Sequence, residues 1–216
     1  MTSLDNIGRW DAYITLSAIA GKSWFIDSDY DNTKIVSEPS TANKVIGVGS
    51  YNSKNSWIDY NGHTQTKNGY PINQISYFSS SGPSRDGREK PDIFAPGAWV
   101  ASTSSSDVVL IVDNFARDFV HYHSIGTSLS APFVTGTVAL LLEQDNDYTY
   151  EDIIDILNES KTPQGYLDVY QAILLHYQDP LLPIRKNPLA RSLNKQFYFY
   201  DFEPEILFSA KRNKIN

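Results

Sequence analysis

One serine of this sequence stands where its hydroxyl could act as a nucleophile. Ser128 lies in the segment Gly126–Gly136, GTSLSAPFVTG, at the point where a loop is expected to become a helix. A hydroxyl there lies at the positive end of the helix dipole, beside backbone N–H groups that have no partner within the helix. The N–H of Ser128 can stabilise the oxyanion that the attack of its own hydroxyl creates. The full pattern therefore predicts acyl transfer at Ser128, although a G-T-S string alone would indicate only a helix N-cap.

A serine hydroxyl is a weak nucleophile unless a histidine accepts its proton and a carboxylate orients that histidine. His121 and His123 shortly precede Ser128 and would share one face of a strand. Nearness in sequence is not catalytic geometry, so we expect partly exposed strand histidines, with a base supplied by one of them as the alternative. His63 and His176 are expected at surface and helix positions and have no evident carboxylate partner.

The composition is that of a globular protein. The chain has 216 residues, 41% of them hydrophobic and 13% aromatic, enough for one sizeable core or for one domain and part of another. A formal net charge of −7 without a basic run argues against a nucleic-acid partner. The absence of cysteine excludes thiol catalysis, disulfides and thiolate zinc sites. No apolar run approaches the ~20 residues of a membrane span, and Met1–Asp5 does not open a signal peptide.

Three zones are expected along the chain. Residues 1–40 are rich in strand candidates, such as Trp10–Leu16 and Ser23–Ile26, and resemble the end of an inserted β domain. Residues 41–178 are better organised and form the main domain. Residues 179–216 hold prolines, basic residues and an aromatic run, QFYFY, which indicate an extension or the start of another domain.

The central zone combines strands and helices. Val45–Gly49 and Val108–Val112 are short apolar runs typical of strands buried on both faces, and another strand is expected at Phe119–His123. The polar stretch Asn52–Asn73 predicts a surface excursion. From Thr127 to Glu143 nearly every residue is small or apolar, which predicts a helix buried on all sides.

Two amphipathic helices are expected after this buried helix. Thr149 can cap the first, which carries Ile153, Ile154 and Leu157 on one face. Asp168 can cap the second. The inward residues of that second helix are expected to be Val169, Ala172 and Ile173. Strands followed by helices predict an α/β layered domain.

The segment around Ser128 resembles the active-serine motif of the subtilisin-like serine proteases, the subtilases. Three further landmarks follow the order of that family. Val45–Gly49 is similar to its VI-x-VG strand, residues 78–97 to its FSS-x-GP … KPD-x-x-APG stretch, and residues 165–172 to a helix near the end of its domain. The resemblance covers residues 43–175. It implies a three-layer α/β fold with a mainly parallel sheet, and peptide hydrolysis through an acyl-enzyme with Ser128 as the nucleophile.

The other catalytic landmarks of the family do not occur in the chain. In subtilases the aspartate lies in a D-(S/T)-G turn, the histidine in an H-G-T helix start and the second oxyanion donor in an A-G-N string, all before the serine. None of these strings is present. Phe133 stands where many members have a histidine outside the triad. The resemblance therefore implies the C-terminal part of a catalytic domain, incomplete at its N-terminal side and inactive by itself.

Three explanations of such a chain are open: a fragment of a longer enzyme, a half that works with a partner chain, and a degenerate remnant. The implied partners are a protein or peptide substrate and the missing N-terminal half of the catalytic domain. By resemblance, the intact enzyme would be secreted or at the cell surface. An incomplete fold would also expose apolar surface. The alternative function is a non-catalytic interaction or scaffold protein that keeps the serine helix for packing.

One acidic loop resembles a calcium-binding loop. Asp27, Asp29, Asp31 and Glu38 fall at positions 1, 3, 5 and 12 of a calcium-loop pattern. Lys34 stands where the pattern has an apolar residue, and the flanks do not predict helices. A solvated acidic turn is therefore favoured over a calcium site.

Overall fold

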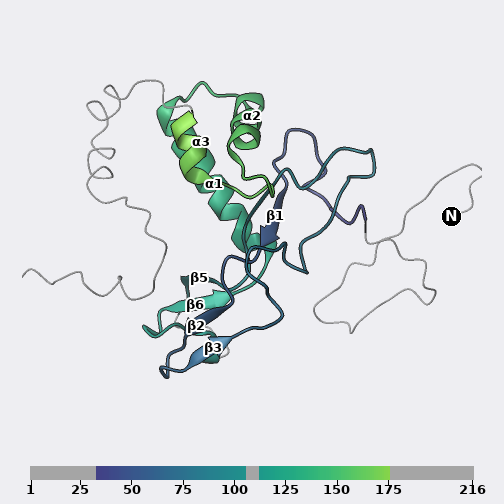
Figure 1. Cartoon of the computed structure of the whole chain (residues 1–216). Coiled ribbons are helices and arrows are strands. Elements are labelled where there is room, and N and C mark those ends of the chain that lie inside the picture. Colours follow the sequence, from purple (N-terminus) through teal and green to yellow (C-terminus); the bar gives the residue numbers. More distant parts are fainter. Residues whose placement is uncertain (1–32, 106–111, 176–216) are drawn as a thin grey trace, which may run out of the picture.

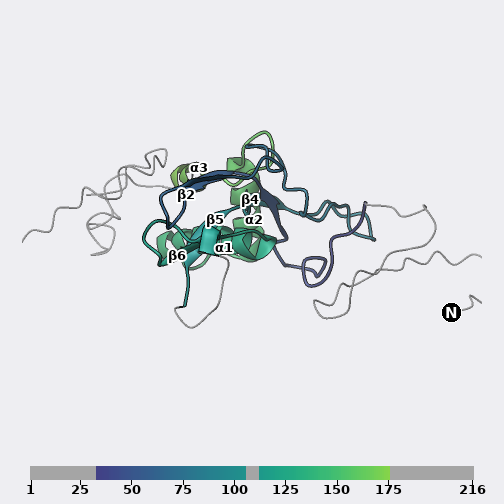
Figure 2. The same ribbon diagram turned by 90° about the horizontal axis from the view of Figure 1, so that it is seen from below.

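The computed structural model of the protein describes residues 33–105 and 112–175, which form two lobes (Figure 1). The lobes overlap when the molecule is seen from below (Figure 2). In the α/β lobe, helices α1 (Thr127–Gln144), α2 (Tyr150–Ser160) and α3 (Val169–Leu175) lie beside strands β1 (Val48–Tyr51) and β4 (Ile93–Pro96). The hairpin lobe holds strands β2 (Ser56–Ile58), β3 (Thr64–Thr66), β5 (Val100–Thr103) and β6 (His121–Ser124) and the 3₁₀ helix η1 (Val112–Asn114).

Strands β1 and β4 form a parallel pair, in register from Val48 opposite Ile93 to Tyr51 opposite Pro96. Helix α1 contacts both strands, and α3 contacts α1 and α2. A parallel pair covered by helices is the arrangement of an α/β fold, so the expected fold class is confirmed. Within the described residues the parallel sheet has only these two strands, which agrees with an incomplete fold.

The core of the α/β lobe is apolar and contains residues of β4, of all three helices and of the loop before α3. Its buried members are Ile93, Ala95, Val134, Leu141, Ile153, Ile156, Leu157, Leu167 and Ala172. Helix α2 begins as predicted, because Thr149 and Asp152 form a capping box. Helix α3 is capped by Asp168, whose Oδ1 accepts a hydrogen bond from the Gln171 N–H at 2.9 Å. The local capping signals therefore located both helices correctly.

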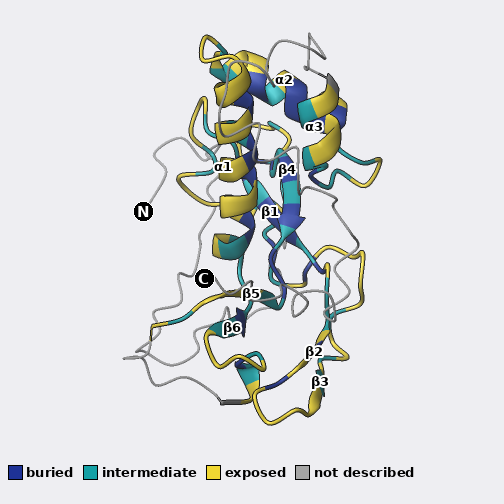
Figure 3. Cartoon of the chain, turned by 90° about the vertical axis from the view of Figure 1, so that its left-hand side faces the viewer, coloured by how far each residue is buried: buried dark blue, intermediate teal, exposed yellow. Residues whose placement is uncertain are grey.

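Helix α1 is more exposed than its sequence predicts. Its buried residues are Ser130, Val134, Thr137 and Leu141, which lie on one side. The opposite side is exposed along most of the helix (Figure 3). The expectation of burial on all sides is wrong for the described residues, because β1, β4 and α3, which contact the helix, cover only one side of it.

The stretch Asn52–Asn73, expected to be a surface excursion, contains the antiparallel hairpin of β2 and β3. Trp57 in β2 is only 6% exposed. Its ring stacks on Trp99 at a centroid distance of 4.8 Å and on His123 at 4.6 Å. Most other residues of the stretch are exposed or half-buried, as expected of a surface excursion. The hairpin and its buried tryptophan were not predicted, because Trp57 is packed by residues far along the chain.

Several expected features lie outside the described residues: Trp10–Leu16, Ser23–Ile26, most of Val108–Val112, His176 and the aromatic run near the C-terminus. The strand expected at Val45–Gly49 begins three residues later, as β1, and the one expected at Phe119–His123 is found as β6. In the part of the chain that the structure describes, no helix is both long and apolar enough to cross a membrane.

Candidate active site

Ser128 is the second residue of α1, at the loop-to-helix junction that the sequence predicts. The turn before it depends on Gly126, whose φ of 148° is rarely adopted by residues with a side chain. The Gly126 N–H donates to the Gly97 carbonyl at 2.8 Å, and the Leu129 N–H donates to the Gly126 carbonyl at 3.0 Å. Ser128 is exposed, and its hydroxyl has no hydrogen-bond partner among the described residues. The hydroxyl is therefore free to meet a ligand.

An open pocket of about 270 Å³ lies beside Ser128. One wall is the start of α1 and the other is the chain that leads into β1. The lining residues are Pro39, Ser40, Val45, Ile46, Val48, Thr127, Ser128 and Ala131. Ser128 thus borders a shallow depression that is open to solvent and has mostly apolar walls.

A group of buried polar side chains, which sequence reasoning missed, ties β1 to the loop before β4. The Ser50 and Ser76 hydroxyl oxygens are 2.8 Å apart, and Ser76 donates to Asn52 Oδ1 at 2.7 Å. The Ser50 N–H donates to Ser79 Oγ at 2.9 Å. The repeated serines of the FSS stretch were the available signal, but their partners in β1 could not be identified from spacing.

Gly97 connects this serine group to the turn that carries Ser128. Its N–H donates to the Tyr51 carbonyl at 3.2 Å, while its carbonyl accepts the bond from Gly126. A Cβ atom at position 97 would collide with the hydroxyl oxygens of Ser50 and Ser130. Only glycine therefore fits between β1 and the first turn of α1.

We expect Gly97→Ala to lower the free energy of unfolding by about 2 kcal/mol, because the added methyl group must displace backbone or buried serines. Gly136→Ala in α1 is the matched control, since a Cβ there meets nothing within 4 Å. It should stabilise the chain by about 0.5–1 kcal/mol through helix propensity. Urea denaturation measures both changes. Equal stability of Gly97→Ala and the unsubstituted chain would contradict the close packing.

A buried ion pair fixes the start of β1 against β4. Lys90 Nζ donates to Asp92 Oδ2 at 2.6 Å and to the Val45 carbonyl at 2.8 Å. The same carboxylate oxygen accepts the Gly47 N–H at 2.6 Å. Because Val45 lines the pocket, this pair also holds one wall of the candidate site in place.

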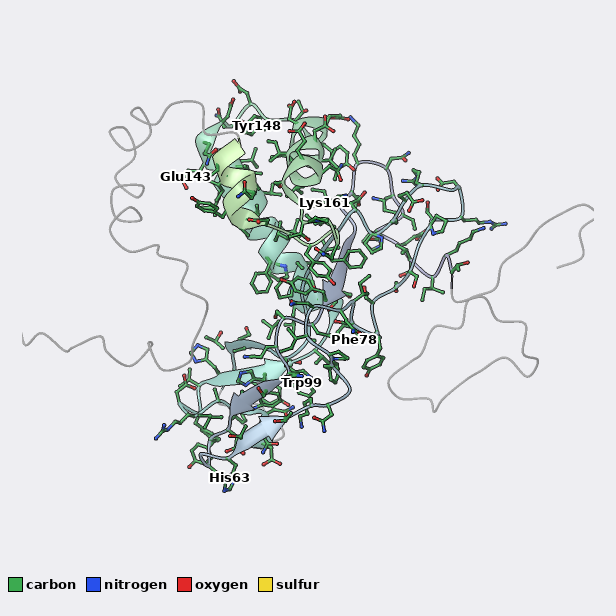
Figure 4. All side chains as sticks on the ribbon, viewed as in Figure 1. His63, Phe78, Trp99, Glu143, Tyr148 and Lys161 are labelled. Carbon is green, nitrogen blue, oxygen red and sulfur yellow. The ribbon has the colours of Figure 1, made fainter. Side chains whose placement is uncertain are left out.

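His121 does not contact Ser128 but pairs with Asp118, its Nδ1 lying 2.5 Å from Asp118 Oδ2. Partial burial alone would raise the pKa of Asp118, but hydrogen bonds from the backbone N–H groups of His121 and Val120 lower it to about 2. His63 is exposed at the tip of the hairpin lobe (Figure 4), but it has a partner that was not expected, because its Nδ1 lies 3.9 Å from Asp59 Oδ2. Neither histidine makes a hydrogen bond to Ser128 among the described residues.

His123 is buried rather than partly exposed, because Trp57 stacks on its ring. Its Nδ1 lies 3.3 Å from the Asn114 carbonyl. The pKa of His123 is lowered to about 4. Burial is the main cause, and the positive charge of Lys54 acts in the same direction. The neutral imidazole of His123 therefore helps to pack the hairpin lobe.

The free energy of unfolding is expected to fall as the pH drops from about 6.5, the pKa of an unfolded histidine, towards about 4. The unfolded chain takes up the His123 proton in this range while the folded chain does not, so the stabilisation is complete only above it. His123→Phe keeps the ring stacking and should flatten this part of the profile in urea denaturation. An unchanged pH dependence in that variant would show that another group titrates.

The acidic loop considered for calcium is described only at its end. Asp27, Asp29 and Asp31 lie outside the described residues, and Glu38 is exposed in a turn. Within residues 33–105 and 112–175, no three His, Cys, Asp or Glu side chains come together to hold a metal ion. Calcium binding stays a prediction that the sequence disfavours.

The model that describes the subtilase family matches residues 11–177. The match begins nearer the N-terminus than the motifs around Ser128 and Val45–Gly49. Because it covers most of the chain, the chain belongs to the subtilase family.

Two relatives and one solved structure illustrate the similarity. An uncharacterised protein of Aquifex aeolicus is 33% identical over 156 residues, 66% of this chain and 63% of that protein. The serine protease AprX of Bacillus subtilis is 29% identical over 150 residues, 68% of this chain and 30% of AprX. The CspB protease of Clostridium perfringens is 26% identical, with a TM-score of 0.47, over 66% of this chain and 29% of CspB. The chain thus spans less than two thirds of each.

Proposed function

We propose that this chain is the nucleophile-bearing part of a subtilase serine endopeptidase. The observation that carries the proposal is the exposed Ser128 at the start of α1, after the Gly126 turn and beside an open pocket. Membership of the subtilase family supports the chemistry, as does the likeness to AprX, a serine protease. The substrate is a protein or peptide.

The chemistry follows from the position of Ser128. Its Oγ attacks the carbonyl carbon of a peptide bond while its proton passes to a histidine, and the carbonyl oxygen becomes an oxyanion. The Ser128 N–H and the positive end of α1 stabilise that charge. The amine leaves with the transferred proton, and an acyl-enzyme remains. A water molecule that loses its proton to the same histidine then releases the acid and restores Ser128.

The histidine, its aspartate and a second oxyanion donor come from residues outside this chain. No D-(S/T)-G, H-G-T or A-G-N string occurs in it. Neither His121 nor His123 makes a hydrogen bond to Ser128 among the described residues, and the His123 ring is buried in the aromatic stack, which supports this division. The chain is therefore inactive alone and works with the N-terminal half of a subtilase catalytic domain.

The domain organisation follows the same division. Residues 41–178 are the C-terminal part of the catalytic domain, residues 1–40 end an inserted β domain, and residues 179–216 are an extension. By analogy with the family, the completed enzyme is exported and acts on proteins outside the cell.

A fluorophosphonate, which reacts with an activated serine, tests the proposal. The chain alone is expected to remain unlabelled. Mixed with a companion polypeptide, built on the subtilase consensus from the D-(S/T)-G turn through the A-G-N string, it should be labelled at Ser128, as located by peptide mass spectrometry. Labelling of the chain alone would show that it has its own base. A folded complex that stays unlabelled would instead support a non-catalytic scaffold.

A further inference from the structure

The hairpin of β2 and β3 carries two Asn-Gly pairs, neither of which takes part in the chemistry at Ser128. Asn61-Gly62 lies in the turn that joins the two strands, and Asn68-Gly69 lies in the turn that follows β3. All four residues are exposed. Asparagine is a chemically labile residue, and a following glycine has no side chain to hinder the approach of its own nitrogen to the asparagine amide.

The reaction open to such a pair consumes only water. The backbone nitrogen of the glycine loses its proton to a base in the solvent and attacks Cγ of the asparagine. A C–N bond forms, the side-chain amide nitrogen leaves as ammonia, and a succinimide ring remains. Water then adds to one of the two ring carbonyl carbons and opens the ring to aspartate or isoaspartate. A neutral amide thus becomes a negatively charged carboxylate.

The turn at Asn61 is held by hydrogen bonds that oppose this reaction. The Gly62 N–H donates to the Asp59 carbonyl at 3.0 Å, and the His63 N–H donates to Asp59 Oδ1 at 2.8 Å. Asp59 is fully buried, and its Oδ2 accepts a further bond from Gln65 Nε2 at 2.8 Å. The Gly62 nitrogen must therefore break its bond to Asp59 before it can attack Asn61.

The turn at Asn68 leaves the corresponding nitrogen available. The Tyr70 N–H donates to the Lys67 carbonyl across this turn at 3.1 Å. The Gly69 N–H has no hydrogen-bond partner in the part of the chain that the structure describes. No bond has to be broken before the Gly69 nitrogen loses its proton. The two pairs are therefore alike in sequence but differ in the state of the attacking nitrogen.

We propose that Asn68 is a site of spontaneous covalent modification, at which the Gly69 nitrogen converts the asparagine through a succinimide to aspartate or isoaspartate. Asn61 is protected by the hydrogen bonds of its turn. The proposal goes beyond the proposed function and is independent of it, because the reaction requires neither Ser128 nor a partner chain.

The modification changes the charge next to an aromatic contact of the hairpin lobe. The Lys67 Nζ lies 5.5 Å from the centre of the Trp57 ring and 5.1 Å from that of the Trp99 ring. Figure 4 labels Trp99 in this lobe. A carboxylate at position 68 attracts the same ammonium group and competes with the two rings for it. The reaction at Asn68 therefore weakens the cover that Lys67 provides for the aromatic stack.

Incubation of the full chain in heavy-oxygen water compares the two pairs directly, because each ring that opens takes up one oxygen atom from the solvent. Lys67 lies between them, so a protease that cleaves after lysine places Asn61 and Asn68 in different peptides for mass spectrometry. In the folded chain, we expect the label to enter at position 68 at least about fivefold faster than at position 61, the factor that one hydrogen bond is worth. In urea the two rates should converge.

Gly69→Ala is the matched variant. A Cβ atom at position 69 meets nothing within 4 Å, and the backbone there is not left-handed, so the fold should be retained. The methyl group hinders the attacking nitrogen, so labelling should slow several-fold at position 68 and stay unchanged at position 61. Three results would overturn the proposal: equal rates at the two positions in the folded chain, a difference that persists unchanged in urea, and labelling at position 68 that ignores Gly69→Ala.

Discussion

Ser128→Ala is expected to abolish fluorophosphonate labelling and to reduce peptide hydrolysis by about 10⁶-fold in the chain completed by its companion polypeptide. The substitution removes the oxygen that forms the acyl bond but leaves the pocket intact. The loss should therefore appear in kcat, with KM and the affinity for the companion nearly unchanged. A fluorogenic peptide assay and calorimetric titration measure these quantities.

Ser130→Ala is the matched control for this experiment. The Ser130 hydroxyl lies two residues further along α1, is fully buried and has no hydrogen-bond partner among the described residues. Removing an unpaired buried hydroxyl is not expected to destabilise the chain. Labelling should therefore persist in Ser130→Ala. Labelling of Ser128→Ala at the same level would eliminate Ser128 as the nucleophile.

Lys90→Met is expected to lower the free energy of unfolding by about 3–5 kcal/mol. The Asp92 carboxylate would keep the Gly47 N–H but lose its cation. Because Lys90 is only 6% exposed, water cannot replace the ammonium group. The Val45 carbonyl would also lose its donor, so the pocket wall should loosen. Chemical denaturation gives the stability change.

Two further variants make the Lys90 result specific. Lys44 also forms a short ion pair, 2.7 Å to Glu151, but both side chains are well exposed, so Lys44→Met should change stability little. The double variant Lys90→Met/Asp92→Leu leaves no buried charge and should regain most of the lost stability. If Lys90→Met proved no more harmful than Lys44→Met, the buried pair would not hold β1 as described.

The parts of the structure that the sequence predicts depend on local signals. The Gly126 turn places Ser128 at a helix start, and Thr149 and Asp168 cap the two following helices. The glycine turn and the two capping residues each act within about one helical turn. A sequence can therefore be interpreted at these positions without knowing the rest of the fold.

The parts that were missed depend on residues distant in the chain. Gly97 meets Ser50 and the Gly126 turn, and Trp57 is buried by Trp99 and by the ring of His123. Hydrophobic periodicity has no information about such pairs. The composition of α1 does not distinguish the side of the helix that is buried from the side that is exposed.

Ser128 belongs to the first turn of α1, and the buried side of that helix packs Val134 and Leu141 into the core. The position of the proposed nucleophile therefore depends on core packing further along the same helix. A core substitution that shifts α1 would misplace the hydroxyl and lower activity even where the chain still folds.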